Sequence, residues 1–157
     1  MGLLDKQFGT SNVVMLRGGA SGIPSEMFQV EPMDLPVSPL GRSIVTGEFT
    51  GDGVADLAVT SPLMSTVSII PGLGAGGVGN GSFGMPMSFS VSTTPLALQK
   101  GDFNIDGITD LAIAGPGGGP GGQLEVLSGG GSEANGNGTF SSEMKLPIGA
   151  GAAGILA

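Results

Sequence analysis

The sequence repeats itself, and this repetition restricts the fold more than any other feature. Residues 47–61 read GEFTGDGVADLAVTS and residues 101–115 read GDFNIDGITDLAIAG, so glycine, phenylalanine, Asp-Gly and Asp-Leu-Ala recur at an offset of 54 residues. Further on, TVSIIPGLG at 66–74 matches QLEVLSGGG at 123–131 at an offset of 57 residues. A period of this length indicates an array of similar structural units.

Weaker matches extend the repeat towards both ends of the chain. They pair NGSF (80–83) with NGTF (137–140), NVVMLRGG (12–19) with TVSIIPGL (66–73), and TTPLAL (93–98) with KLPIGA (145–150). Together they predict one domain of about three units, each of roughly 55 residues. The expected units span approximately 1–46, 47–100 and 101–157.

Each unit is expected to consist of short antiparallel strands. Runs such as SNVVML, TVSII and SFSVS are rich in β-branched residues and alternate with glycine-rich turns, and glycine accounts for 32 of the 157 residues. No segment shows a sustained helical period with capping residues. The sequence therefore predicts an all-β protein.

Two of the units contain a loop in which oxygen-bearing residues stand at alternate positions. In the second acidic loop (102–110), such residues fill positions 1, 3, 5, 7 and 9, and a glycine at position 6 permits a sharp turn. The candidate ligands are the side chains of Asp102, Asn104, Asp106 and Asp110 and the carbonyl of Ile108. Hard oxygen donors favour Ca²⁺, whereas Mg²⁺ demands a tighter octahedron with more water and is the second choice. Position 12 is Ile113 rather than glutamate, so the loop is not an EF-hand.

The first acidic loop (48–56) fills the same positions with weaker donors. Its candidate ligands are the side chains of Glu48, Thr50, Asp52 and Asp56 and the carbonyl of Val54. Because Glu48 is one methylene longer than aspartate and Thr50 offers a neutral hydroxyl, we expect Ca²⁺ to bind here more weakly. Six of the 13 acidic residues lie in the two loops, so bound ions would offset much of the net charge of −8. For both loops, the alternative is an Asp/Gly turn without an ion.

The stretch GDFNIDGITDLAIA, followed by a strand, a glycine-rich turn and NGTF, resembles the FG-GAP or VCBS repeat of integrin α-type propellers and bacterial surface proteins. The resemblance covers nearly the whole chain and is clearest in residues 95–140 and 44–83. It implies β-propeller blades of four antiparallel strands with Ca²⁺ in the acidic loop. It also implies an extracellular or cell-surface location and a role in adhesion or structure.

Composition argues against several other functions. The chain has no His and no Cys, and no residue is placed to activate its serines and threonines, so we expect no enzymatic activity. Only five Lys and Arg and a net charge of −8 argue against nucleic acid as a partner, and no apolar run is long enough for membrane insertion. The G-x-G-x-x-G patterns at 74–79 and 149–154 open no predicted helix, so they do not indicate a dinucleotide site. The Asn-Gly sequons at 80–82 and 137–139 are interpreted as hairpin turns rather than glycosylation sites.

Three units are too few to close a propeller, which needs about four to eight blades. We therefore expect an incomplete propeller that other subunits complete. The unit missing an acidic loop is divided between the head, GLLDKQF (2–8), and the tail, GAGAAGILA (149–157), and both ends are expected to be strands that pair within the chain or with a neighbour.

The favoured hypothesis is a calcium-binding structural protein that binds copies of itself through β-strand pairing, forming an extracellular oligomer, filament or tube. The alternative is a cell-surface adhesion or carbohydrate-binding module with a glycan or surface ligand. A third interpretation is a partner-binding domain of an enzyme.

Overall fold

The computed structural model describes residues 2–7, 10–17 and 29–33 as backbone, and residues 41–117, 121–149 and 155 with their side chains. All regular structure in these residues is β-strand, and every strand pair is antiparallel. The predicted all-β class is therefore confirmed. Nowhere in the described part of the chain is there a helix with the length and apolar character needed to cross a bilayer.

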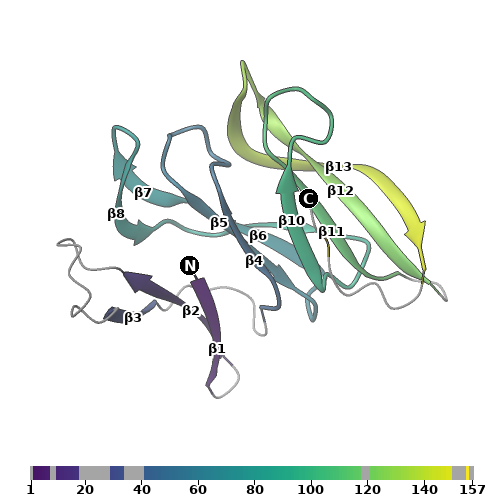
Figure 1. Cartoon of the computed structure of the whole chain (residues 1–157), viewed down its shortest axis with the longest axis horizontal. Coiled ribbons are helices and arrows are strands. Elements are labelled where there is room, and N and C mark those ends of the chain that lie inside the picture. The colour runs from purple at the N-terminus through teal and green to yellow at the C-terminus, as the bar shows by residue number, and fades with distance from the viewer. Residues whose placement is uncertain are drawn as a thin grey trace.

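The strands form three sheets and one hairpin (Figure 1). The first sheet has the order β1-β2-β3 and consists of β1 (Gly2–Gln7), β2 (Thr10–Arg17) and β3 (Gln29–Met33). The middle sheet has the order β4-β5-β6-β9 and consists of β4 (Ile44–Gly47), β5 (Asp56–Ser61), β6 (Thr66–Ile70) and β9 (Met87–Ser90). The last sheet has the order β10-β11-β12-β13 and consists of β10 (Ala97–Gly101), β11 (Asp110–Pro116), β12 (Gly122–Ser132) and β13 (Asn135–Ile148).

The middle and last sheets have the same topology. Each has four antiparallel strands paired in the order in which they occur in the chain, and an acidic loop joins the first strand to the second. They differ after the third strand. In the middle sheet, β7 (Gly72–Ala75) and β8 (Val78–Phe83) form a separate hairpin, whereas β12 and β13 stay paired to their shared turn. Register shifts at Val126/Leu127 and Gly129/Gly131 accommodate this longer pairing. The described strands form open, blade-like sheets and no closed ring.

One expected match is wrong. Residues 145–148 lie in β13 and pair with β12, just as β9 pairs with β6, so they correspond to β9 and not to residues 93–98. The latter stretch links β9 to β10 and enters β10 at Ala97. The two stretches look alike because each carries a proline among small and apolar residues. The three-unit division of the chain stays a prediction.

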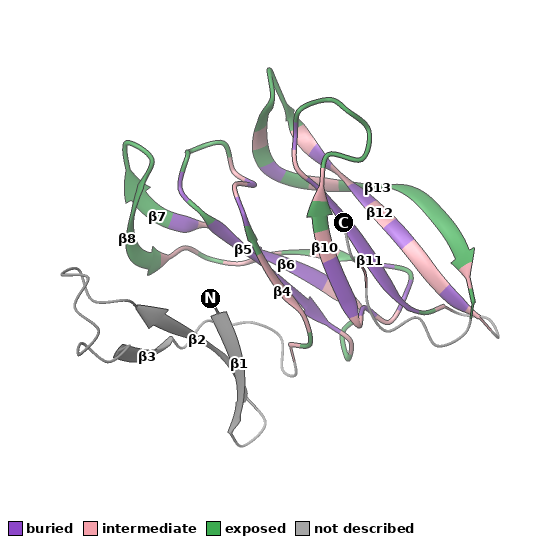
Figure 2. Cartoon of the chain, in the orientation of Figure 1, coloured by how far each residue is buried: buried purple, intermediate pink, exposed green. Residues whose placement is uncertain are grey.

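A core shared by the middle and last sheets holds them together. Alternation along the strands places Ala58, Val67 and Ile69 of the middle sheet and Leu111, Ile113 and Leu127 of the last sheet in one buried cluster. Phe140 joins it with its ring edge-on to Phe49, at a centroid distance of 6.0 Å. Both faces of β5 and β11 are buried, as their apolar sequences predict (Figure 2).

The opposite face of the middle sheet has its own cluster. Leu57, Val59 and Ile70 are buried there, and Ile44 and Phe83 pack against them. Each of these five residues precedes a residue of the last sheet in the shared core by 54 or 57 positions, namely Leu98, Leu111, Ile113, Leu127 and Phe140. The two sheets therefore use corresponding residues on corresponding faces.

Of the two chain ends, only the head is largely within the described residues. Its residues 2–7 form β1 and pair with β2 of the same chain. The tail is described only at Gly149 and Ile155, so the predicted strand at 149–157 lies mostly outside the described residues.

Candidate metal-binding loops

Each acidic loop connects the first strand of its sheet to the second. The first acidic loop follows β4 and ends at Asp56, the first residue of β5. The second acidic loop follows β10 and ends at Asp110, the first residue of β11. The ninth loop position therefore lies inside the sheet, whereas the preceding positions project beyond it.

The two loops have the same backbone signature. Position 4 has a positive φ in both, 81° at Gly51 and 62° at Ile105. Position 6 has a positive φ as well, 78° at Gly53 and 83° at Gly107. A left-handed conformation costs an L-residue roughly 1–2 kcal/mol, so Ile105 is strained where Gly51 is not. The repeated motif thus specifies one loop shape.

A glycine before each loop allows the loop phenylalanine to fold back. A Cβ atom on Gly47 would lie 2.6 Å from Cζ of Phe49, and a Cβ atom on Gly101 would lie 2.8 Å from Cζ of Phe103. Any larger residue would displace the ring. This contact explains why glycine stands two positions before phenylalanine in both repeats.

The carboxylates at position 9 are buried and tie each loop to its sheet. The Asp56 carboxylate accepts hydrogen bonds from the backbone N–H groups of Phe49 (2.8 Å), Thr50 (3.1 Å) and Gly72 (2.8 Å), and from the Thr50 hydroxyl (3.1 Å). The Asp110 carboxylate accepts from the N–H groups of Phe103 (2.8 Å) and Gly129 (2.9 Å). Such charge-assisted bonds are stronger than neutral ones. Each aspartate therefore links the start of its acidic loop to a glycine further along the chain, Gly72 in β7 for Asp56 and Gly129 in β12 for Asp110.

The exposed side chains of the second acidic loop converge on its backbone. Oδ1 of Asp102 and Oδ1 of Asn104 each lie 3.1 Å from the N–H nitrogen of Asp106, which donates to both. Gly107 N–H donates to Oδ2 of Asp102 at 2.9 Å. The amide of Asn104 donates to Oδ2 of Asp106 at 3.0 Å and to the hydroxyl of Ser128 at 3.0 Å. The structure thus brings Asp102, Asn104 and Asp106 together.

The first acidic loop is braced differently. Oε1 of Glu48 accepts from the N–H groups of Thr50, at 3.0 Å, and Gly51, which are positions 3 and 4 rather than 5 and 6. Asp52 accepts from the N–H of Val54 at 2.8 Å, just as Asp106 accepts from Ile108 at 2.8 Å. The two loops therefore agree at position 5 and differ at positions 1 and 3.

All the side-chain donors of both loops are oxygens or, in Asn104, an amide that offers an oxygen, which suits a hard cation. At position 7, Val54 and Ile108 have buried side chains that hold this part of the loop in place. Among the residues that the structure describes, no three side chains of Asp, Glu, His or Cys form a group that could hold a metal ion. The assignment of the ten positions as Ca²⁺ ligands therefore stays a prediction.

The two loops also differ in what covers them. Each lies against the hairpin of its own sheet, since a Cβ atom on Gly53 would approach Gly77 and one on Gly107 would approach Ala134. The first acidic loop is covered by the last sheet as well, because Gly138 N–H donates to the carbonyl of Phe49 at 2.8 Å. As a result, Phe49 is 2% exposed and its counterpart Phe103 is 43% exposed.

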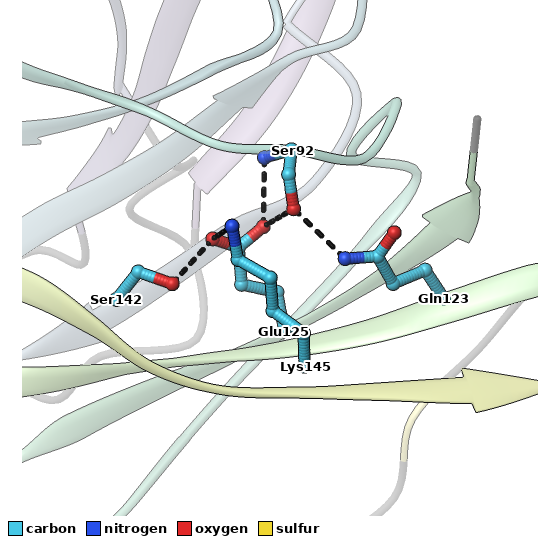
Figure 3. Close-up of polar contacts among 5 residues, drawn as sticks. All are labelled: Ser92, Gln123, Glu125, Ser142 and Lys145. Carbon is cyan, nitrogen blue, oxygen red and sulfur yellow. Dashed lines mark hydrogen bonds and ion pairs between the residues drawn. The ribbon is translucent and has the colours of Figure 1, made fainter.

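A buried glutamate that the sequence analysis missed joins the two sheets (Figure 3). Glu125, in β12, is 1% exposed and accepts hydrogen bonds from the N–H and hydroxyl of Ser92, both at 2.7 Å, and from the hydroxyl of Ser142 at 2.8 Å. The Nζ atom of Lys145 lies 3.7 Å from its Oε1. Since Ser92 lies between β9 and β10, this cluster fastens the link between the sheets.

Burial raises the pKa of the Glu125 carboxyl, but the hydrogen bonds from Ser92 and Ser142 and the charge of Lys145 outweigh it, so the pKa is lowered from its usual 4.5. The sequence contained a signal for this residue. Glu125 is a lone acid within an apolar strand, at the position that Ser68 occupies in the middle sheet. Its cross-strand partner Lys145 likewise replaces Ser88, whose hydroxyl lies 2.8 Å from that of Ser68.

The fold and its loops define a class, namely antiparallel blade-like sheets with an acidic loop between their first two strands. A comparison with protein-family models matches residues 40–82 to the FG-GAP repeat. This part of the chain, which contains the first acidic loop and β4 to β7, is similar to the FG-GAP repeat, as the sequence resemblance predicted. Searches of curated proteins and of solved structures found no match.

Proposed function

We propose that this chain is a calcium-binding structural protein that assembles with copies of itself outside the cell. The observation that carries the proposal is the shared backbone signature of the two acidic loops, which present oxygen donors at the same positions of an FG-GAP-type repeat. The FG-GAP repeat supports a β-propeller-type domain, and calcium and self-assembly are the further steps proposed here.

In the second acidic loop, Asp102, Asn104, Asp106, the carbonyl of Ile108 and Asp110 would hold the ion. A bound Ca²⁺ supplies positive charge that offsets the repulsion among the loop carboxylates. The protein contributes preorganisation, because the N–H groups of Asp106 and Gly107 already fix the carboxylate of Asp102. In the first acidic loop, Glu48, Thr50, Asp52, the carbonyl of Val54 and Asp56 would hold a more weakly bound ion.

Strand pairing is the proposed route of assembly. In the described part of the chain, β1 pairs with β2 on one side and lies at the edge of a three-stranded sheet, whereas the two sheets after it have four strands. A free strand edge presents unpaired N–H and C=O groups that bind a strand from another chain. We propose that a strand from a second copy adds to β1.

The absence of His and Cys from the sequence supports a non-enzymatic role. An extracellular or cell-surface location accords with calcium dependence, because extracellular modules work with weakly bound ions.

The test measures calcium binding and particle size on the same samples. We expect calorimetry to detect two Ca²⁺ per chain, and light scattering and negative-stain images to show oligomers or filaments. Chelator is expected to lower the melting temperature, because an ion at 100 times its Kd stabilises the folded state by about 2.7 kcal/mol per site. Absence of calcium binding would refute the metal sites. Calcium binding by a chain that remains monomeric would refute self-assembly and leave an adhesion or glycan-binding module as the better hypothesis.

A further inference from the structure

One face of the last sheet carries apolar side chains whose counterparts on the middle sheet pack into the shared core. Eight described residues form the middle sheet's side of the shared core. Six of them, all except Val45 and Val91, are paired here with their counterparts 54 or 57 positions later. The pairs are Phe49 and Phe103, Ala58 and Ala112, Val67 and Leu124, Ile69 and Val126, Met87 and Met144, and Phe89 and Leu146. We call the second member of each pair, taken together, the open face.

The open face lines a hollow of about 450 Å³. Phe103, Met144 and Leu146 remain 43%, 49% and 44% exposed, and Figure 2 shows the outer half of β13 as largely exposed. Ile155 also lines this hollow, together with the polar residues Asn104 and Glu143. A largely apolar exposed surface of this kind on a folded chain marks an interaction site.

The structure itself shows what covers such a face. On the middle sheet, the corresponding residues are covered by a sheet of the same plan, through Leu111, Ile113 and Leu127. These three are counterparts of Leu57, Val59 and Ile70, which lie on the other face of the middle sheet. The contact within the chain therefore joins unlike faces of two similar sheets.

We propose that the open face binds a second copy of this chain, in a head-to-tail contact that repeats the packing of the last sheet on the middle sheet. This inference rests on the proposed self-assembly and adds a second contact surface to the strand edge at β1. Because unlike faces meet, the contact between copies is heterologous. The contact therefore builds a ring if the rotation closes and a filament if it does not.

Charge substitutions on the open face test the proposal. Met144→Glu and Leu146→Glu each place a carboxylate in the contact, and we expect each to raise the protein concentration required for assembly by at least about tenfold. Leu63→Glu is the matched control, because Leu63 is 65% exposed in the turn between β5 and β6. Circular dichroism and calcium titration of each variant establish that it is folded.

The lack of cysteine in the chain allows a direct test of contact. Met144→Cys, labelled with a benzophenone maleimide, is expected to cross-link to a second chain at a peptide outside residues 97–148. Leu63→Cys with the same label is expected to give no cross-linked dimer.

Several outcomes would overturn the proposal. Cross-links from Met144→Cys within the same chain, to the segment around Ile155, would show that the chain covers its own hollow. Cross-links between two copies of residues 97–148 would show a symmetric contact of like faces. Assembly unaffected by either charge variant would refute the open face while leaving self-assembly intact, and a monomeric wild type would refute both.

Discussion

The middle and last repeats have the same loop motif but place it in different surroundings. The first acidic loop lies under the last sheet, and its Phe49 is part of the shared core. The second acidic loop has the better set of oxygen donors, and its Phe103 remains partly exposed. The motif determines the shape of the loop, whereas the neighbouring sheet determines how far the loop is buried.

The largest expected difference in unfolding free energy is between variants of the two loop phenylalanines. Phe49→Ala removes a buried ring from the shared core and should lower the free energy of unfolding by about 3–5 kcal/mol. Phe103→Ala removes a half-exposed ring and should cost about 1 kcal/mol in the monomer. Urea denaturation of both variants at low protein concentration measures the difference. Equal losses would show that the two loops are equally covered.

The next effect contrasts the two aspartates at position 9 of the loops. Asp56→Ala leaves the buried N–H groups of Phe49 and Gly72 without an acceptor and should cost about 3 kcal/mol. Asp110→Ala removes two hydrogen bonds rather than four and should cost about 2 kcal/mol. Both are measured in excess chelator, so that lost ion binding does not contribute. A negligible loss of unfolding free energy at either position would show that the hydrogen bonds of that aspartate do not stabilise the fold.

A smaller effect concerns Glu125, which replaces the serine of the middle sheet. Its pKa is lowered in the folded state from the usual 4.5, so its contribution to stability is complete above that pH and is lost as the pH falls through the folded-state pKa. Glu125→Gln should cost about 1 kcal/mol at pH 7 and should reduce the loss of stability in acid. Ser68→Ala serves as the control and should leave the acid response unchanged. Identical pH profiles for wild type and Glu125→Gln would contradict this assignment.

The smallest effect concerns position 4 of the loops. Ile105 is a β-branched residue with a φ of 62°, and it is 90% exposed, so it has little packing to lose. Ile105→Asn should stabilise the monomer by about 0.5–1 kcal/mol, because asparagine tolerates the left-handed conformation. Gly51→Ala at the corresponding position should destabilise it, both through its positive φ and because a Cβ atom there would clash with the carbonyl oxygen of Gly136. Thermal melts of the two variants that shift in the same direction would refute the common loop shape.

Much of this architecture could be predicted from the sequence, because the repeat and the alternation of apolar residues are local signals. The strands, their antiparallel class and the position of each acidic loop between two strands follow from such signals. The separate β7–β8 hairpin did not follow, since NGSF and NGTF look alike although only one of them ends a hairpin that leaves its sheet.

Other features depend on contacts between sheets, which no local pattern encodes. Phe49 and Phe103 occupy the same position in the repeated motif. Only the packing of the last sheet on the middle sheet makes their exposed fractions differ. The sequence analysis treated Asp56 and Asp110 as ion ligands only, and missed that both are buried acceptors of backbone hydrogen bonds. Glu125 was missed because its partner Ser92 lies 33 residues away in the chain.

Both acidic loops are proposed to bind Ca²⁺, the second more tightly than the first. Calorimetric titration of wild type, Asp52→Ala and Asp106→Ala tests this directly, with Glu143→Ala as a control acid outside both loops. We predict two sites in wild type, loss of the tighter site in Asp106→Ala and loss of the weaker site in Asp52→Ala. No calcium binding by wild type would refute both metal sites, and equal losses of affinity in the two loop variants would refute the tighter binding by the second loop.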